Sequence, residues 1–399
     1  MKEAVIIGYL RSPFSRSRPT DPDRDVFNPF RMDELGAMVV NELFNRTGLD
    51  KGDVDEFLTA CALCVAENWM WGGRKIPLLA EFPDTVPSKM IDQQCASSMA
   101  TIHMGAMEIM LGYSNVVVSV GIEHMTHIPM VNNPMLDYND KFFTDTRYKR
   151  YDMDTAANMG LTAEKLAGLR GIPREEMDRW SMRSHQRATQ GLENGFFKDE
   201  IMPIEVKLPD GERVIDSDVS IRPDTNMDGL SGLKTVFKEG GVITAGNSSP
   251  LNAGVAVMIL MSKDEARKRG LKPLATIRSM ASAGVDPSIM GQGPVPSSRK
   301  ALETAGLSVD DIDIWEINEA FAVVTLNAIK ELGIDPEKVN IRGGAIAIGH
   351  PLGATGTRLV GTLARILKVE RKRYGLATAC VGGGQGVATV IELENYDSF

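Results

Sequence analysis

Residues 91–100 read IDQQCASSMA, and they place one cysteine, Cys95, between a polar run and a long helical pattern. Apolar residues recur at roughly helical spacing after Cys95 and before Gly112: Met99, Ile102, Met107, Ile109, Met110 and Leu111. Cys95 should therefore open a helix, where unpaired amides and the positive end of the helix dipole favour an anion. A thiol at that position should lose its proton more easily than a free cysteine, which makes Cys95 a candidate nucleophile. The alternative is a small buried cysteine that packs like alanine.

The half of the chain that contains this stretch shows a sequence pattern that occurs again in the second half. The segments TGLDKGDVDEFLTA, at 47–60, and AGLSVDDIDIWEIN, at 305–318, match at five positions with one offset, 306 minus 48, or 258. The same offset places Cys95 opposite residue 353, inside the glycine-rich run GGAIAIGHPLGATG, which also precedes a helical pattern. An offset shared by several positions signals an internal duplication.

Two similar halves, each with alternating strands and helices, predict an α/β protein whose helices pack on both faces of mixed sheets. The two helix starts are expected to face each other near a shared centre. A strand is predicted at 4–8 and a helix at 32–43.

A stretch of different amino-acid composition, rich in methionine, aromatic and charged residues, lies between the halves at 123–246. The predicted domains are an N-terminal half at 1–122, completed by about 247–270, an inserted loop domain at 123–246, and a C-terminal half at 271–399. Helices are predicted at 156–170 and 174–193 within the insertion. An insertion between two halves of one core must lie on its surface, so it is expected to cover the active site, either as a ligand-binding lid or as a dimerisation arm.

Composition excludes several classes of protein. The chain has 399 residues, more than one hydrophobic core usually supports, with 43% hydrophobic and 24% charged residues, as in an ordinary globular enzyme or scaffold. A net charge of -9 argues against a general nucleic-acid binder, because a basic surface for phosphate contact is missing. Apolar runs are too short for a signal peptide or a membrane span, so a cytoplasmic location is predicted.

The four cysteines, Cys61, Cys64, Cys95 and Cys380, are too few for a disulfide framework and suit a reducing compartment. Cys61 and Cys64 form a C-x-x-C pair, but no second pair or nearby histidine completes a zinc site. We therefore predict no metal site, and we expect this pair to pack in or near the core.

Four segments carry reactive side chains: the Cys95 stretch, WEINEAFA with Asn318, AIGHPLGATG with His350, and TACVGGGQG with Cys380. In this order and at these separations they resemble the thiolase family of acetyl-CoA C-acyltransferases, and the resemblance covers nearly the whole chain. It implies a duplicated thiolase fold in a layered α-β-α-β-α arrangement with an inserted loop domain. A phosphate loop is not expected, since the chain has no G-K-[ST] motif.

The resemblance implies that Cys95 is the acylated nucleophile. Cleavage of a 3-ketoacyl thioester needs a soft nucleophile, a proton donor for the departing enolate, and donors for two oxyanions. His350 could take the Cys95 proton because histidine titrates near neutrality, and Cys380 could protonate the enolate and later activate coenzyme A. By similarity, His350 and a water held by Asn318 form one oxyanion hole, and the amides of Cys95 and Gly382 form the other. A turn-stabilising His350 and a helix-capping Asn318 are the alternatives.

For substrate binding, the resemblance points to Ser249, in TAGNSSPLNAG, as a contact of the pantetheine arm. Met159 is the other expected pantetheine contact, because Asn158 stands where biosynthetic members of the family have histidine. Met290 follows the family pattern near the nucleophile, and Phe321 is expected to line the pocket. Coenzyme A enters as a substrate, and no covalently bound cofactor is expected.

A basic group in the insertion either contacts phosphates or forms a solvated face: Lys141, Arg147, Lys149 and Arg150. The remaining histidines are assigned no catalytic role: His103, His124, His127 and His185.

We therefore expect a degradative 3-ketoacyl-CoA thiolase that binds acyl-CoA and coenzyme A. The alternatives are a biosynthetic acetoacetyl-CoA thiolase, a decarboxylating condensing enzyme and a non-catalytic acyl-CoA carrier. The patterns CASSM and GIEHMTHIP are most similar to the thiolase subunit of the bacterial fatty-acid oxidation complex, which suggests a hydratase/dehydrogenase subunit as a partner. A homodimer or homotetramer is also expected, from the family and from methionine-rich segments such as 104–110.

Overall fold

One mixed sheet runs through the computed structural model, which describes residues 2–209 and 211–394. Its strands follow the order β4 (Ser88–Ile91), β3 (Glu56–Ala60), β5 (Val116–His124), β8 (Asn252–Ser262), β1 (Ala4–Arg11), β9 (Ala275–Gly284), β12 (Gln385–Leu393), β11 (Tyr374–Val381) and β10 (Ile314–Ile317). The short strand β2 (Ser15–Arg16) pairs with β8. The strand predicted at 4–8 is confirmed as the start of β1, and the last residues of the predicted C-terminal half, 395–399, lie outside the described residues.

The two halves of the sheet repeat one arrangement. β3 is parallel to β5, which is antiparallel to β8, and in the same way β10 is parallel to β11, which is antiparallel to β12. β3 and β5 start at residues 56 and 116, and β10 and β11 start at 314 and 374, so both pairs keep the offset found in the sequence. The halves join where β1 pairs with β9, Val5 with Thr276 and Ile6 with Ala275. The predicted duplication is confirmed, with the two sheets joined at this short seam.

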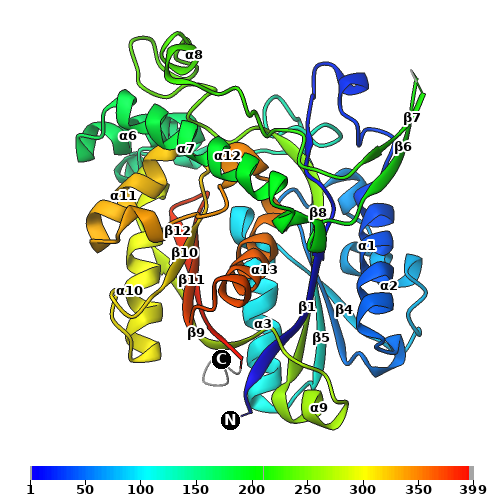
Figure 1. Ribbon diagram of the computed structural model, residues 1–399. Coiled ribbons are helices and arrows are strands. Elements are labelled where there is room, and N and C mark those ends of the chain that lie inside the picture. Colours follow the sequence, from blue (N-terminus) through cyan, green and yellow to red (C-terminus); the bar gives the residue numbers. More distant parts are fainter. Residues whose placement is uncertain (1, 210, 395–399) are drawn as a thin grey trace.

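Helices complete five layers, which follow one another across Figure 1. α1 (Met32–Thr47) and α2 (Gly72–Leu79) cover one outer face, and α10 (Pro294–Ala305), with α11 (Ala322–Leu332) beside it, covers the other. α3 (Ser97–Leu111) and α13 (Leu352–Glu370) lie between the two halves of the sheet. This is the α-β-α-β-α arrangement that the sequence implies. Among the described helices, none is long and apolar enough to span a membrane.

Matched glycines end matched helices in the two halves. α1 ends at Gly48 and α10 ends at Gly306, with φ angles of 68° and 69°. Glycine adopts this left-handed conformation without the steric cost that a Cβ atom brings, so it ends a helix cleanly. The helix predicted at 32–43 continues to Thr47 because the chain stays helical up to that glycine.

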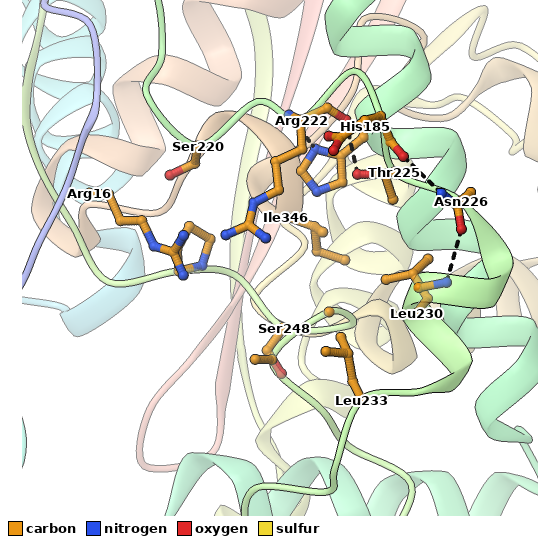
Figure 2. Close-up of a pocket in the computed structure, with 15 residues that line it drawn as sticks. Arg16, His185, Ser220, Arg222, Thr225, Asn226, Leu230, Leu233, Ser248 and Ile346 are labelled. Atoms are coloured by element: carbon orange, nitrogen blue, oxygen red, sulfur yellow. Dashed lines mark hydrogen bonds between the residues drawn. The ribbon is translucent and has the colours of Figure 1, made fainter.

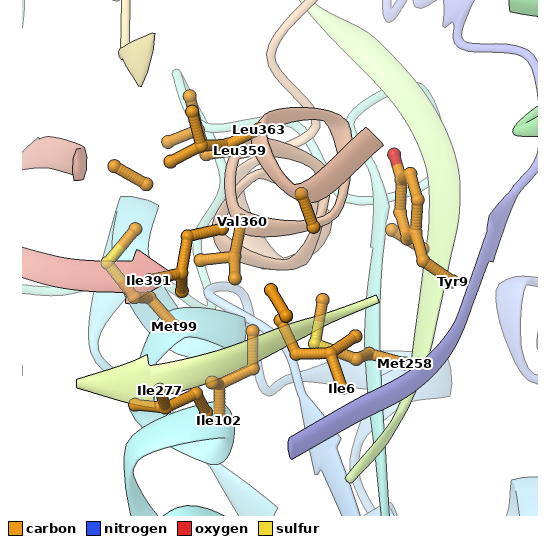
Figure 3. Packing of buried hydrophobic residues seen from close by; sticks show 14 of the residues in the cluster. Ile6, Tyr9, Met99, Ile102, Met258, Ile277, Leu359, Val360, Leu363 and Ile391 are labelled. Atoms are coloured by element: carbon orange, nitrogen blue, oxygen red, sulfur yellow. The ribbon is translucent and has the colours of Figure 1, made fainter. Parts of the chain in front are cut away.

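The central layer is formed by α3 packed against α13. Apolar side chains of both helices meet residues from both halves of the sheet in one buried cluster, which includes Ile6, Met99, Ile102, Met258, Ile277, Leu359, Val360, Leu363 and Ile391 (Figure 3). The helices lie in close contact at Gly356, where an added Cβ atom would lie 2.2 Å from the backbone nitrogen of Met99. Ser98 Oγ also accepts a hydrogen bond from the backbone nitrogen of Thr357 at 2.9 Å. The two helix starts therefore meet at a shared centre, as predicted.

The segment 123–246 forms small elements at one end of the layers, at the top of Figure 1: α4 (Lys141–Thr144), α5 (Met153–Ala156), α6 (Met159–Arg170), α7 (Arg174–Glu193), the hairpin β6 (Ile204–Leu208) and β7 (Gly211–Ile215), and α8 (Met227–Ser231). The helix predicted at 174–193 is confirmed as α7. The predicted start of the preceding helix, at 156, is wrong. α6 begins only at Met159 because the side chain of Asn158 caps it, accepting hydrogen bonds from the amides of Gly160 and Leu161. The short helix α9 (Lys263–Lys268) follows β8.

Candidate active site

Cys95 lies at the junction between β4 and α3. It is the middle residue of a single 3₁₀ turn, Gln94–Ala96, and α3 begins directly after this turn. The residue is 8% exposed and packs in a small apolar cluster with Ala62, Met125 and Leu352. The predicted position of Cys95 at a helix start is confirmed to within one turn, and Leu352, the first residue of α13, connects it to the second half.

His350 follows α12 (Ala345–Ile348) and is almost completely buried. Its backbone nitrogen donates to Asn252 Oδ1 at 2.7 Å, which fixes the loop. Its Nδ1 lies 2.6 Å from Thr355 Oγ1, and this hydroxyl donates to the carbonyl oxygen of Pro351 at 2.8 Å. Because the hydroxyl proton is already used, Nδ1 must carry the hydrogen and donate to Thr355. Nε2 therefore keeps its lone pair.

Asn318 follows β10 and places its side-chain amide against His350. Its Nδ2 lies 3.3 Å from Nε2 of His350, which accepts the hydrogen bond. Its backbone nitrogen donates to the carbonyl oxygen of Thr378 at 2.9 Å, so it is held beside β11. Asn318 Oδ1 is buried and has no hydrogen-bond partner among the described residues. Asn318 does not cap a helix, because Phe321 is the N-cap residue of α11.

Cys380 lies fully buried near the end of β11, and Gly382 follows that strand directly. The backbone amides of Gly382 and of Cys95 itself donate hydrogen bonds toward the Cys95 sulfur. A negative charge on Cys95 raises the pKa of Cys380, so the two thiols are electrostatically coupled. The two thiols and two amides thus lie together, and the Asn318–His350 pair is linked to them through Leu352, which packs against Cys95, and through Thr378, which precedes Cys380 on β11.

Burial keeps these reactive groups uncharged at rest. It raises the pKa of Cys95 to about 11 and that of Cys380 well above the ordinary cysteine value. It also lowers the pKa of His350 to about 3, with a further contribution from Arg358. Two expectations from the sequence are therefore wrong for the resting protein, since Cys95 does not ionise easily and His350 does not titrate near neutrality. Desolvation is the main cause for both: at Cys95 the two nearby amides offset only part of its cost, and at His350 the Arg358 charge adds to it.

Three of the four predicted substrate contacts lie around this centre. Met290 and Phe321 are buried in the same apolar cluster as Cys380, and Met159 packs against that cluster. The sulfur of Met159 lies 3.7 Å from the position that a Cβ atom on Gly382 would occupy. These side chains form an apolar wall beside the buried thiols.

A cavity of about 310 Å³ opens beside the fourth predicted contact, Ser249, and no sequence motif predicted it. Ser248 and Pro250 line the cavity on either side of Ser249, whose own side chain does not. Two arginines, Arg16 and Arg222, point into the same cavity (Figure 2). They are far apart in the sequence and share no motif, so only the fold brings them together.

The basic group of the insertion, formed by Lys141, Arg147, Lys149 and Arg150, lies away from this cavity lining. All four of its side chains are at least partly exposed, and none lines this cavity. Arg147 pairs with Asp145 at 2.6 Å, and Arg150 donates to the hydroxyl of Tyr151 at 2.6 Å. The structure therefore favours the solvated-face interpretation for this group.

Glu319 of the WEINEAFA segment ties the insertion to the centre. Its Oε1 accepts from Trp180 Nε1 at 2.9 Å and from Asn340 Nδ2 at 2.8 Å. Its Oε2 accepts from Ser184 Oγ at 2.7 Å and from the backbone nitrogen of Ile346 at 3.1 Å. Trp180 and Ser184 belong to α7, so a buried carboxylate with four donors joins the insertion to the loops of the C-terminal half.

Glu123 has the corresponding role on the nucleophile's side. Buried at the end of β5, it accepts hydrogen bonds from the amides of Ala62 at 3.0 Å and Gly353 at 3.1 Å, and from the Cys61 thiol at 3.4 Å. Burial raises its pKa to about 7, and its charge in turn raises the pKa of Cys95. Cys61 thus packs in the core, as predicted, but the sequence did not indicate that a carboxylate lies beside Cys95.

The remaining histidines have structural partners. His103 lies 2.8 Å from Thr389 Oγ1, the rings of His124 and His127 stack at 3.7 Å, and His185 accepts from the backbone of the cavity wall. Across residues 2–209 and 211–394, histidine, cysteine, aspartate and glutamate side chains form no group of three or more that could hold a metal ion.

Comparisons with known proteins agree with one another. Residues 4–264 match the family model described as "Thiolase, N-terminal domain", and residues 271–393 match "Thiolase, C-terminal domain". The chain is 42% identical to a Klebsiella pneumoniae protein over 398 residues and 40% identical to a Bacillus subtilis protein over 405 residues. Both relatives are named 3-ketoacyl-CoA thiolase, and each alignment covers 98% of this chain and 100% of the relative.

Solved structures give the same result. Human mitochondrial 3-ketoacyl-CoA thiolase superposes with a TM-score of 0.88 at 32% identity, over 98% of this chain and 99% of that one. The same human protein in complex with CoA gives a TM-score of 0.87, with 98% of both chains covered. Bacillus anthracis acetyl-CoA acetyltransferase gives 0.86 at 38% identity, over 98% of this chain and 99% of that one.

A thiol with a pKa of about 11 should react with an alkylating agent only through its small thiolate fraction. We expect alkylation of Cys95 by iodoacetamide to accelerate roughly tenfold per pH unit from about pH 7 to about pH 10, without a plateau. Intact-mass measurement against Cys95→Ser corrects for reaction at the half-buried Cys64. A plateau below about pH 8 would contradict this expectation, since it would mean that a thiolate already exists at rest.

Proposed function

The chain belongs to the thiolase family of acyltransferases, and from this premise we propose that it is a 3-ketoacyl-CoA thiolase of fatty-acid degradation. The proposed reaction converts a 3-ketoacyl-CoA and coenzyme A into acetyl-CoA and a shortened acyl-CoA, through an acyl-Cys95 intermediate. The proposal is supported by three links within the buried centre: the Cys95 charge acts on Cys380, Leu352 packs against Cys95 two residues after His350, and Asn318 donates to His350. This arrangement supplies a nucleophile, an acid and a base within one site.

In the first half-reaction, Cys95 attacks the keto carbon of the substrate. As the carbon–sulfur bond forms, the thiol proton passes to Nε2 of His350, the ring nitrogen with the lone pair. The keto oxygen becomes an oxyanion, and the amides of Cys95 and Gly382, which lie beside the attacking sulfur, are its proposed donors. When the oxyanion collapses, the carbon–carbon bond breaks and its electrons form the enolate of acetyl-CoA.

The enolate then takes a proton from Cys380. Its oxygen is stabilised by the protonated Nε2 of His350 and by a water held by Asn318, as the family resemblance implies. Protonation of Nε2 ends its acceptance of the Asn318 hydrogen bond, so the Asn318 amide is free to hold that water. The acetyl-CoA product leaves, and Cys95 keeps the shortened acyl group.

In the second half-reaction, the Cys380 thiolate removes the thiol proton of coenzyme A. The coenzyme thiolate attacks the acyl carbon, the two amides hold the oxyanion again, and Cys95 departs with the proton from His350. Both cysteines and the histidine then return to their resting protonation states.

The pKa values of the resting protein constrain when the proton can move during these steps. Burial raises the pKa of the Cys95 thiol to about 11 and lowers that of the His350 imidazole to about 3, so both groups favour their uncharged forms. A separate ion pair is therefore not formed before the substrate arrives. Proton transfer must accompany the attack, when the developing oxyanion provides the compensating interactions.

A biosynthetic acetoacetyl-CoA thiolase is the nearest alternative, and the likeness to the Bacillus anthracis acetyl-CoA acetyltransferase keeps it in consideration. Against it, Asn158 is used as the cap of α6 at the position where biosynthetic members have histidine. A decarboxylating condensing enzyme is disfavoured because it has histidine where this chain has Asn318. A non-catalytic acyl-CoA carrier is disfavoured because the binding of acyl-CoA alone requires no pair of buried thiols.

We also propose that residues 123–246 form an inserted domain over the active site, between an N-terminal half at 1–122, completed by about 247–270, and a C-terminal half at 271–399. The attachment of α7 to Glu319 and the contact of Met159 with Gly382 support this division. Substrate contacts by Ser249, Met159, Met290 and Phe321 belong to the same proposal. A hydratase/dehydrogenase partner and a cytoplasmic location stay predictions.

Thiolysis of 3-ketoacyl-CoA substrates from about four to about sixteen carbons tests the function directly. We expect turnover to extend to the longer chains and to stop in Cys95→Ala, together with the mass increase of one acyl group on the protein. The fold should survive this change, because a small residue replaces a small one. Activity confined to the four-carbon substrate would favour the biosynthetic alternative, and absence of any acyl-enzyme would favour the carrier.

Cys380→Ala tests the proton-transfer role. We expect turnover to fall by about 10² to 10⁴-fold, roughly 3 to 5 kcal/mol of barrier, because a positioned acid or base typically contributes that much. Cys95 should still be acylated by acetyl-CoA, although more slowly, since His350 accepts its proton but the departing coenzyme thiolate no longer receives one from Cys380. Exchange of the acetyl-CoA methyl protons with deuterated water should be lost, because the reverse reaction needs the same residue as base. Exchange at the wild-type rate would assign the base to His350 or to a bound water instead.

A homo-oligomer is part of the proposal, and one edge of the sheet supports it. β4 is the last strand in the N-terminal half, so one of its sides lacks a paired strand among the described residues. Trp69, Met70 and Trp71 are 64%, 67% and 75% exposed, and they line a cavity of about 1110 Å³ together with Met90 of β4. An open edge flanked by exposed aromatic side chains suits pairing with a second copy of this chain.

Light scattering at micromolar concentration should therefore show at least a dimer. The double change Trp69→Ser and Trp71→Ser should weaken it, whereas Val369→Ser, which removes an exposed apolar side chain of α13 that does not line this cavity, should not. A clean monomer in the wild-type protein would remove the oligomer proposal without affecting the enzyme assignment.

A further inference from the structure

Glu123, one residue before the end of β5, carries a carboxylate that no cation neutralises. Its side chain is completely buried, and among the described residues it accepts hydrogen bonds only from backbone nitrogens and a thiol. By contrast, the buried Glu316 pairs with Arg358 at 2.8 Å, and the buried Glu200 pairs with Arg11 at 2.9 Å. A buried carboxylate without a cation is costly, and only the hydrogen bonds that it accepts can offset this cost.

One oxygen of this carboxylate joins the two halves of the molecule. Glu123 Oε2 accepts from the backbone nitrogen of Ala62, in the loop after β3, at 3.0 Å, and from that of Gly353, in the first turn of α13, at 3.1 Å. The other oxygen, Oε1, accepts from the Cys61 thiol at 3.4 Å. Because β3 belongs to the N-terminal half and α13 to the C-terminal half, Oε2 bridges the halves through backbone groups.

The two bridged segments also hold the reactive groups. The side chain of Ala62 packs against Cys95, and so does that of Leu352, which directly precedes Gly353. His350 lies three residues before Gly353 in the same loop and helix start. A shift of the first turn of α13 relative to the loop after β3 would therefore change how Cys95 and His350 lie relative to each other. These are the two groups between which a proton moves in the proposed mechanism.

The start of α13 is seated directly against the strand ends. An added Cβ atom on Gly353 would lie 2.3 Å from the carbonyl oxygen of Ile122 and 2.8 Å from Cα of Cys61. This contact prevents the helix start from moving closer to β3 and β5. The hydrogen bonds to Glu123 oppose movement in the other direction, so the position of the first turn is fixed from both sides.

The charge of Glu123 also acts on the nucleophile. Burial is the main cause of the raised pKa of Cys95, and the charges of Glu123 and Asp92 raise this pKa further. Burial also raises the pKa of Glu123 itself, to about 7. Glu123 is therefore mostly uncharged below that pH and mostly charged above it, and only the charged form opposes ionisation of Cys95.

The elements packed against Glu123 bring backbone and thiol groups to it. Across the sheet, β8 places Gly254 opposite Glu123, and α13 presents the amide of Gly353. The loop after β3 presents Cys61, which stays a thiol because burial and its contact with Cys64 hold its pKa well above the ordinary value. Cys61 and Cys95 are therefore the titratable groups that face the carboxylate among the described residues.

We propose that Glu123 is a positioning residue for thiolysis, whose carboxylate fixes the loop after β3 and the first turn of α13 around Cys95 and His350. This inference rests on the proposed function. Glu123 takes no part in the proposed bond changes and acts through Ala62 and Gly353.

Two substitutions separate the hydrogen bonds of Glu123 from its charge. Glu123→Gln keeps an oxygen in place of Oε2 for both amides and removes the charge, and its NH₂ group can donate to the Cys61 sulfur. Glu123→Asp keeps the charge but is one methylene shorter, so it cannot hold both amides without shifting them. Glu164→Asp is the matched control, because it shortens another buried carboxylate that accepts from backbone nitrogens, those of Val242 and Ile243 in the insertion.

We expect Glu123→Asp to lower kcat for thiolysis by about 10²-fold with little change in KM, because a displacement of about 1 Å can cost that much. Glu123→Gln should keep kcat close to the wild-type value, since it retains the bridge between the halves. Glu164→Asp should lower the melting temperature without this loss of kcat. Circular dichroism checks that each variant is folded.

Reaction of Cys95 with methyl methanethiosulfonate, without substrate, gives a second readout that a loosened fold would not produce. The rate in Glu123→Gln, divided by the wild-type rate, should be close to one below about pH 6, where Glu123 is protonated in the wild type. The ratio should rise above one by about pH 8, because the wild-type carboxylate then opposes ionisation of the thiol. Peptide mass analysis identifies the adduct on Cys95, and Glu164→Asp should leave the wild-type rates unchanged.

Four results would overturn the inference: wild-type kcat in Glu123→Asp, an equal loss of kcat in Glu123→Gln, an equal loss in Glu164→Asp, or a rate ratio that does not change with pH. The last result would mean that no ionised carboxylate acts on the nucleophile. Because the thiol reaction needs no substrate, the two proposals can fail separately. A wild-type protein without thiolysis would overturn the proposed function, whereas the rate ratio would still test the place of Glu123 beside Cys95.

Discussion

The close contact between α3 and α13 is the constraint on which the active site depends. Each helix follows the loop that carries a reactive side chain, Cys95 before α3 and His350 before α13, so the loops meet only if the helix starts touch. Gly356 permits this contact, because any side chain there would overlap the backbone of Met99. The hydrogen bond from the Thr357 amide to Ser98 then fixes how far one helix slides along the other. Packing at the centre of the fold therefore sets the geometry of the chemistry.

The duplication gives each half a similar loop followed by a central helix. Because the amino acids at matched positions differ between the halves, the two loops form one asymmetric site. The offset of 258 relates Cys95 to Gly353, where an added Cβ atom would lie 2.3 Å from the carbonyl oxygen of Ile122. No side chain fits at Gly353, and its amide binds Glu123 instead. The first half thus provides the nucleophile, while the second half provides the histidine and the second thiol.

The sequence was most informative where the signal is local or repeated. The common offset predicted two similar halves, and the four motifs predicted which residues meet, because a glycine, a helix start or a strand end can be read from neighbouring residues. It failed where the outcome depends on burial. The expected ionisation of Cys95 and His350 was wrong because the local helix start was visible and the desolvation was not. The pairing of Arg16 with Arg222 was also invisible, since nothing but the three-dimensional fold connects these positions.

The burial of the reactive groups has a chemical consequence for the proposed function. A centre without resting charges has a low effective dielectric, so amide donors act strongly on an oxyanion that develops there. The same low dielectric makes it costly to bring a highly charged substrate into the centre. In the proposed function, only the uncharged thioester end of the substrate reaches Cys95. The charged part of coenzyme A can then contribute binding energy without introducing charges that would weaken the buried donors.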